Sequence, residues 1–126
     1  QNGKVYAFIQ SALDNPDLAN DNTSRNSLNL RILEFDTRTL QPTAEYLYRL
    51  ESLNADKIGD AVSLGNGKFL VVERDDNSGA NAFKKVYEID IAGATDLSKA
   101  NLSQLPANRT IETASLEELA AAGIRP

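Results

Sequence analysis

Short apolar runs alternate with turn-forming residues along most of the chain, which is the pattern of a mainly β protein. In residues 44–51, for example, Tyr46, Tyr48 and Leu50 fall on one face of an extended chain, with charged residues on the other. On this basis we predict antiparallel strands over six segments. They are Lys4–Gln10, Leu28–Asp36, Ala44–Glu51, Ile58–Leu64, Lys68–Arg74 and Lys85–Ile91.

Two of these segments also predict how they pack. Residues 4–10 are apolar on both faces, as expected of a strand that lies between two layers. In residues 58–64, Ile58, Val62 and Leu64 share one face, whereas the other face holds only small residues. Small residues allow a neighbouring sheet to come close.

Part of the pattern occurs twice. The sequence Asn-Gly-Lys at residues 2–4 returns at residues 66–68. The order basic, apolar, apolar, Glu, apolar, Asp occupies both residues 31–36 and residues 85–90. Antiparallel repeats of this length are typical of β-propeller blades. We therefore predict about one and a half blades, and a β-sandwich is the alternative.

The predicted division has three parts. Residues 1–53 form the last three strands of one blade, residues 54–93 the first three strands of the next, and residues 94–126 a connector. The connector begins with a helical turn at residues 94–98, capped by Thr95 or Asp96, and continues as an irregular segment. A capping box of Ser115 and Glu118 then predicts a short C-terminal helix that ends at Gly123.

Composition excludes several kinds of site. The chain has 126 residues, enough for one domain, and contains neither cysteine nor histidine. It therefore has no disulfide, no thiolate zinc site, no cysteine nucleophile and no histidine base. A net charge of −5 is the wrong sign for binding nucleic acid, and no apolar run is long enough for a transmembrane helix.

Carboxylates and amides are the main chemical resource that remains. The loop at residues 11–27 is rich in both and includes Asp14 and Asp17, which are candidate ligands for Ca²⁺. The alternative is a solvated surface loop rich in turn formers.

A second acidic group, Asp75 and Asp76, which are also candidate metal ligands, follows Glu73 and Arg74 at the end of a predicted strand. Either Glu73 or Arg74 faces inward, and an inward carboxylate needs an arginine or a metal ion as partner. The structural alternative is an arginine–carboxylate pair that anchors the blade. Asp60 is a third candidate, which either lines a central channel or hydrogen-bonds a neighbouring turn.

Several of these segments together resemble the phytase-like family, also described as "esterase-like activity of phytase". They are residues 30–36, 46–50, 58–60, 67–75 and 85–90, with the Glu-Arg-Asp triplet at 73–75 as the most specific. The resemblance implies a secreted or periplasmic propeller protein that hydrolyses carboxylic or phosphate esters. Its substrate would be a small anionic ester, with Ca²⁺ as a candidate cofactor.

By the same resemblance, Asp60, Glu73, Arg74 and Asp75 are the candidate catalytic residues. Two readings stay open: part of an enzyme, or a non-catalytic binding or scaffold module. We also expect the chain to be a piece of a longer protein. If it is, the isolated piece has no activity and associates with itself through open strand edges.

Overall fold

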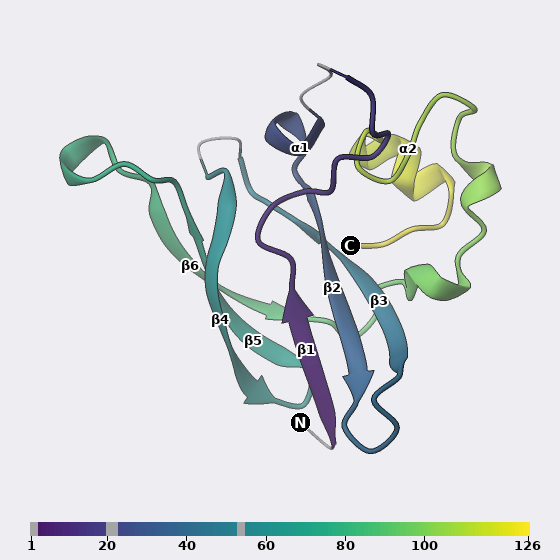
Figure 1. The fold of residues 1–126 in the computed structure, drawn as a ribbon, viewed down its shortest axis with the longest axis horizontal. Helices are drawn as coiled ribbons and strands as arrows, with labels where there is room; N and C mark the ends of the chain where they lie inside the picture. Colours follow the sequence, from purple (N-terminus) through teal and green to yellow (C-terminus); the bar gives the residue numbers. More distant parts are fainter. Residues whose placement is uncertain (1–2, 20–22, 53–54) are drawn as a thin grey trace.

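The computed structural model describes residues 3–19, 23–52 and 55–126, with the backbone alone at residues 23 and 24. It contains two three-stranded antiparallel sheets, ordered β1-β2-β3 and β4-β5-β6 (Figure 1). The strands are β1 (Lys4–Phe8), β2 (Asn29–Asp36), β3 (Pro42–Arg49), β4 (Lys57–Gly65), β5 (Lys68–Arg74) and β6 (Lys84–Asp90). All six predicted strands are confirmed, and their ends differ from the prediction by at most two residues.

The helical segments are short. They are α1 (Thr23–Asn26), α2 (Leu116–Ala121) and the 3-10 turns η1 (Gly79–Asn81), η2 (Leu97–Lys99) and η3 (Leu102–Gln104). At six residues, α2 is the longest helix in the described residues, and none there has the length of a membrane span.

Capping agrees with the sequence in two places. Ser115 accepts a hydrogen bond from the N–H of Glu118 at 3.1 Å, which begins α2 as predicted. Asp96, one of the two predicted caps, accepts from the N–H of Ser98, although the turn begins at Leu97 rather than at residue 94. The segments predicted to be irregular also contain η3 and α1. These two are too short to show the repeat of apolar residues by which a helix is recognised in a sequence.

The repeated sequence pattern produces the same strand pairing in both sheets. Lys4 of β1 lies opposite Asp36 of β2, and Lys68 of β5 lies opposite Asp90 of β6. The pairing then runs on without a shift in both hairpins. The strands β1 and β2 therefore correspond to β5 and β6.

One apolar core lies between the two sheets. Its buried members are Ala12, Leu30, Ile32, Tyr48, Leu50, Ile58, Phe69 and Val71. The ring of Phe69 contacts the rings of Tyr6 and Phe8 edge-on, with centroids 5.0 and 5.2 Å apart. Such aromatic contacts between layers fix the distance and the angle at which the two sheets meet.

A second core covers the opposite face of the first sheet. There Leu47 packs against the C-terminal segment (Figure 1), whose buried members are Leu97, Leu105, Ile111, Ala114, Leu119, Ala122 and Ile124. A six-residue helix is too short to be stable alone, so α2 depends on this packing. The first sheet is thus the middle layer of three.

A buried ion pair fixes the C-terminal segment to β2. Arg31 donates through Nε to Glu112 at 2.7 Å, and the Glu112 side chain is fully buried. The other carboxylate oxygen of Glu112 accepts from Asn15 at 2.9 Å. Asn29 donates to two backbone carbonyls of the segment, at 2.7 and 3.0 Å. Every charge buried here has hydrogen-bond partners, which offsets its desolvation.

Two predictions about strand faces are wrong. The first strand is not enclosed on both faces, because β1 lies at the edge of its sheet and Val5 is 53% exposed. In β4 the pairing shifts between Ile58 and Asp60. After this bulge Ala61 packs on the core, whereas Val62 is 57% exposed. Because side chains alternate along a strand, one extra residue exchanges its two faces.

Candidate functional site

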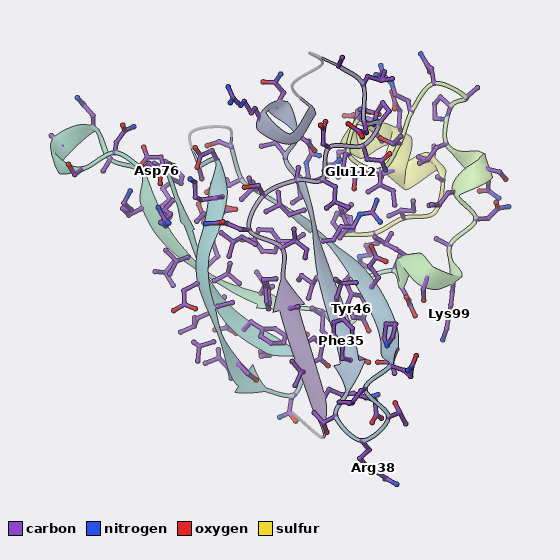
Figure 2. All side chains as sticks on the ribbon, in the orientation of Figure 1. Phe35, Arg38, Tyr46, Asp76, Lys99 and Glu112 are labelled. Atoms are coloured by element: carbon purple, nitrogen blue, oxygen red, sulfur yellow. The ribbon has the colours of Figure 1, made fainter. Side chains whose placement is uncertain are left out.

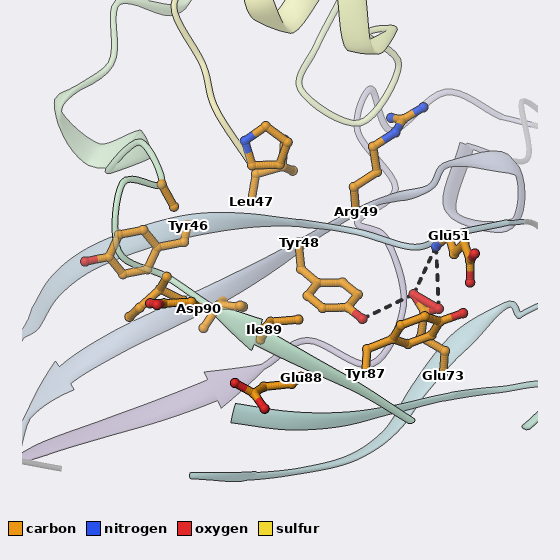
Figure 3. Close-up of a pocket in the computed structure, with 14 residues that line it drawn as sticks. Tyr46, Leu47, Tyr48, Arg49, Glu51, Glu73, Tyr87, Glu88, Ile89 and Asp90 are labelled. Atoms are coloured by element: carbon orange, nitrogen blue, oxygen red, sulfur yellow. Dashed lines mark hydrogen bonds between the residues drawn. The ribbon is translucent and has the colours of Figure 1, made fainter. Parts of the chain in front are cut away.

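A cleft of about 400 Å³ lies between the two sheets, bordered by their outermost strands β3 and β6 (Figure 3). Aliphatic side chains such as Ile32, Ile89 and Ile91 form part of its wall. Three tyrosines and several charged side chains complete it. A concave apolar site with a few polar groups is the usual form of a small-molecule site.

Glu73 is the most deeply buried charged residue of this cleft, at 1% exposure. It follows Phe69 and Val71 on the face of β5 that points to the first sheet. One carboxylate oxygen accepts from the Tyr48 hydroxyl at 3.2 Å and from the N–H of Glu51 at 3.0 Å. Tyr48 belongs to β3 and Glu51 follows just after its end, so Glu73 joins the second sheet to the first.

Of the two predicted kinds of partner, an arginine or a metal ion, no arginine pairs with Glu73 among the described residues. Arg74 points elsewhere, and the ion pairs found among the described residues do not include Glu73. Burial is the largest cause that raises the pKa of Glu73 above its usual value, and its hydrogen bonds oppose this rise. The result is a carboxyl group that holds its proton more tightly than one in water.

Two tyrosines approach Glu73 from opposite sheets (Figure 3). The hydroxyl of Tyr48 donates to Glu73, and burial followed by the charge of Glu73 raises the pKa of Tyr48 far above its usual value. The hydroxyl oxygen of Tyr87 is buried and has no hydrogen-bond partner among the described residues. A buried polar group without a partner is costly, so this hydroxyl lacks a hydrogen bond that the described residues do not supply.

Asp60 lies apart from this cleft. It lines a hollow of about 290 Å³ formed by β1, the following Gln10 and β4. Its side chain is exposed and accepts from the N–H of Ala61 at 2.8 Å. The bond is to the next residue of its own strand, not to a neighbouring turn.

Arg74 contacts the strand next to it. Its side chain crosses the backbone of Gly59, where a Cβ atom would come within 2.8 Å of its Cδ. Its guanidinium donates to Asp76 at 2.9 Å, and Asp76 also accepts from Lys57 at 2.6 Å. The family resemblance includes residues 58–60 and residues 73–75, and Gly59 and Arg74 bring these two segments into contact. Asp76, which follows the second segment, is labelled in Figure 2.

Asp75 faces a third, polar hollow of about 580 Å³. The ammonium of Lys84 lies 2.7 Å from its carboxylate, and the side-chain amide of Asn77 donates to it at 2.9 Å. The hydrogen bond from Lys84 is the largest cause that holds the pKa of Asp75 well below its usual range.

The predicted calcium ligands do not come together. Asp14 and Asp17 are exposed in the loop after β1, and residues 20–22 of that loop lie outside the described residues. Asp75 and Asp76 already bind lysine and arginine side chains. Across residues 3–19, 23–52 and 55–126, no three acidic side chains are grouped to hold a metal. The described residues alone do not assemble a calcium site, so we derive no step through Ca²⁺, and a role for Ca²⁺ stays a prediction.

A protein-family model described as "Esterase-like activity of phytase" matches residues 1–125. The chain belongs to the phytase-like family. The resemblance inferred from the short sequence segments is thereby confirmed. Comparisons with curated proteins and with solved structures gave no match.

In this phytase-like chain three of the catalytic candidates, Glu73, Asp75 and Asp60, line three separate hollows, and Arg74 lines none of these three. Of the four, only Glu73 lines the cleft between the sheets.

The alternation in residues 44–51 predicts that Tyr48 shares a face with Tyr46 and Leu50, and Tyr48 does lie in the core between the sheets, whereas Tyr87 is not among the site residues predicted from the sequence. The repeat contained a signal for it, because Tyr87 stands where the first copy has Leu33.

We expect Glu73→Gln to change how stability depends on pH. Such a carboxyl group has a higher pKa in the folded than in the unfolded state. Its contribution to the stability of the fold is therefore lost as pH rises from the unfolded-state pKa through the folded-state pKa. Glutamine keeps an acceptor for Tyr48 and Glu51 but does not titrate. The free energy of unfolding is measured with urea between about pH 4 and pH 7. The value for the variant minus the value for the wild type should increase as pH rises.

Glu117→Gln on the exposed surface of α2 is the matched control, since it makes the same change in charge outside the cleft. Its difference from the wild type should stay nearly constant over the same range. A Glu73→Gln difference that is flat, or that moves the opposite way, contradicts the raised pKa.

Proposed function

We propose that this chain carries part of an ester-hydrolysing site in the cleft between β3 and β6, with Glu73 as the group that transfers the proton. One observation supports this most: a carboxyl group is buried there beside two tyrosine hydroxyls, and it forms no ion pair with any residue that the structure describes. Carboxyl groups with raised pKa values serve as proton donors and acceptors near neutral pH. Membership of an esterase-like family supports the choice of reaction.

Hydrolysis joins the oxygen of a water molecule to the acyl carbon and breaks the bond from that carbon to the alcohol oxygen. In its ionised form Glu73 would accept the proton that the water loses, and in its protonated form it would return that proton to the alcohol. The Tyr87 hydroxyl would donate to the acyl oxygen as negative charge develops there. Tyr48 would keep Glu73 in position through the hydrogen bond it already makes.

A scaffold role is the second candidate, and the hydrogen bonds of Glu73 favour it. The carboxylate already accepts from Tyr48 and from the N–H of Glu51, which joins the two sheets. A group held in this way stabilises the fold without any chemistry. The two roles predict different behaviour when only the titrating group is removed.

The test is the hydrolysis of p-nitrophenyl acetate and p-nitrophenyl phosphate by the natural full-length protein and its Glu73→Gln variant. If Glu73 transfers the proton, kcat should fall by about 100-fold or more while KM changes little. Glu117→Gln is again the control and should keep full activity. Full activity in a folded Glu73→Gln protein refutes the catalytic role and leaves the scaffold role.

Three finer points belong to the same proposal. Family membership supports an ester as substrate, and the anionic class of that ester rests on resemblance alone. The absence of cysteine is compatible with a secreted or periplasmic protein. The acidic loop at residues 11–27 is what supports Ca²⁺ assistance.

We also propose that the two sheets are parts of neighbouring propeller blades, divided at residues 1–53, 54–93 and 94–126. In the correspondence between the hairpins, Tyr6 matches Leu70 and Val5 matches Phe69. Tyr6 faces the second sheet, whereas Phe69, not Leu70, faces the first. Equivalent faces therefore point the same way, as in stacked blades, and do not meet as they would in a two-fold sandwich.

The isolated chain should associate with itself. Its outermost strands have unpaired edges, and Val62, Leu64 and Val86 on the second sheet are 57, 49 and 63% exposed. Light scattering at increasing concentration should show a mass above that of one chain, and Val86→Lys should lower it. A monomer of the unaltered chain at all concentrations would refute the association.

A further inference from the structure

We propose that Lys85 determines the specificity of the cleft by binding an anionic group of the ester. The ester would then have two unlike ends. Its apolar end would lie between the sheets, against Ile32 and Ile89, and its anionic end would lie beside Glu73. This inference rests on the proposed function, because it names the class of ester that the same site would take.

The alternation along β6 places Lys85 on the side of the sheet that faces the cleft. Ile89 packs on the core between the two sheets, and Lys85, four residues before it, shares its face. The strand pairing also sets Lys85 directly opposite Glu73 of β5. Glu88, on the other face of the sheet, pairs with Lys68 at 3.7 Å. Of the charged side chains of β6, Lys85 is therefore the one that shares a face with Glu73.

The ammonium of Lys85 has only weak partners among the described residues. Its ion pair is with Glu51 at 3.8 Å, and the two side chains are 55 and 54% exposed. It also lies 5.3 Å from the centre of the Phe83 ring, whose face attracts a cation. An exposed ion pair of this length contributes little in water, so an anionic ligand can take the place of Glu51.

Other basic side chains around the cleft bind elsewhere. The guanidinium of Arg49 donates to Asn29 at 2.6 Å, on the far face of the first sheet. The ammonium of Lys84 lies 2.7 Å from the carboxylate of Asp75, outside the cleft. Among the described residues, an anionic group that enters this end of the cleft would therefore find its cation in Lys85.

Lys85 is also close enough to act on an ester held at Glu73. Its partner Glu51 lines the cleft, and the N–H of Glu51 donates to Glu73 at 3.0 Å. Burial is the largest cause that raises the pKa of Glu73, and the positive charge of Lys85 is among the causes that lower it. The carboxylate of Glu51 would repel an anion there, and its exposed side chain can turn toward water to make room.

The apolar end of the ester has a matching wall. Ile32, Ile89 and Ile91 contribute aliphatic surface, and the ring of Tyr46 adds to it. Four residues separate Lys85 from Ile89, which is about 13 Å in an extended strand. A phenylalkyl chain that ends in a carboxylate covers this distance once the lysine side chain is included. The cleft volume of about 400 Å³ is in the range of small-molecule sites.

The inference and the proposed function fail separately, because binding is measured without turnover. A protein that binds an anion through Lys85 and hydrolyses nothing refutes the hydrolysis alone. A protein that hydrolyses esters without any contribution of Lys85 to anion binding refutes this inference alone.

The experiment measures the binding of 6-phenylhexanoate and of its uncharged analogue 6-phenylhexan-1-ol, by calorimetric titration of the natural full-length protein at about pH 7. Lys85→Gln should weaken the binding of the carboxylate about fivefold or more and leave the alcohol within about twofold, because the ammonium attracts only the charged ligand. The proposal is overturned if the carboxylate shows no saturable binding to the unaltered protein. It is also overturned if Lys85→Gln weakens both ligands equally, or neither.

Two further variants separate Lys85 from a general effect of charge. Lys68→Gln removes the same charge from a matched pair on the other face of the sheet, where Lys68 is 48% exposed and 3.7 Å from Glu88. It should leave the binding of the carboxylate within about twofold. Glu51→Gln removes the competitor for Lys85 while its N–H still donates to Glu73, and should strengthen that binding about two- to threefold. A loss with Lys68→Gln as large as that with Lys85→Gln, or weaker binding with Glu51→Gln, refutes the role of Lys85.

Discussion

The two sheets meet around a carboxylate that has a hydroxyl and a backbone amide as partners in place of a cation. Glu73 extends from β5 and accepts from Tyr48 and from the N–H of Glu51, at the end of β3. An unpaired buried charge is costly, so these donors and the surrounding apolar core have to be in place together. The position of the cleft follows from this junction, because its buried end is Glu73 and its sides are the diverging strands β3 and β6.

The first sheet packs against a neighbour on each of its two faces. One of its faces contributes to the core with the second sheet, and the other binds the C-terminal segment through Arg31, Asn29 and Leu47. This explains why the side chains of β3 alternate between tyrosines that line the cleft and residues such as Arg49 that point to the C-terminal segment. The same alternation keeps the guanidinium of Arg49 on the far face, where it donates to Asn29.

Much of the fold could be predicted from the sequence, because alternation, turn residues and the repeat act locally. The bulge at Gly59, which exchanges the faces of β4, could not, since it lies where the side chain of Arg74 from the neighbouring strand passes over the backbone, a contact that no local pattern contains. For the site, the sequence found Glu73 but grouped it with Asp60 and Asp75, which the fold places in other hollows. Neighbours in sequence alternate across a strand, and the partners of Glu73 come from a strand more than twenty residues away.

The most direct test of the role of Glu73 is a double-mutant cycle with Tyr48→Phe and Glu73→Leu, measured by urea unfolding at about pH 7. In the unaltered protein, Tyr48→Phe should cost about 1–2 kcal/mol, because it removes a hydrogen bond to a buried carboxylate. In the Glu73→Leu background the same change should cost almost nothing. An equal cost in both backgrounds would show that the hydroxyl and the carboxylate are not coupled, and would contradict this account of the junction.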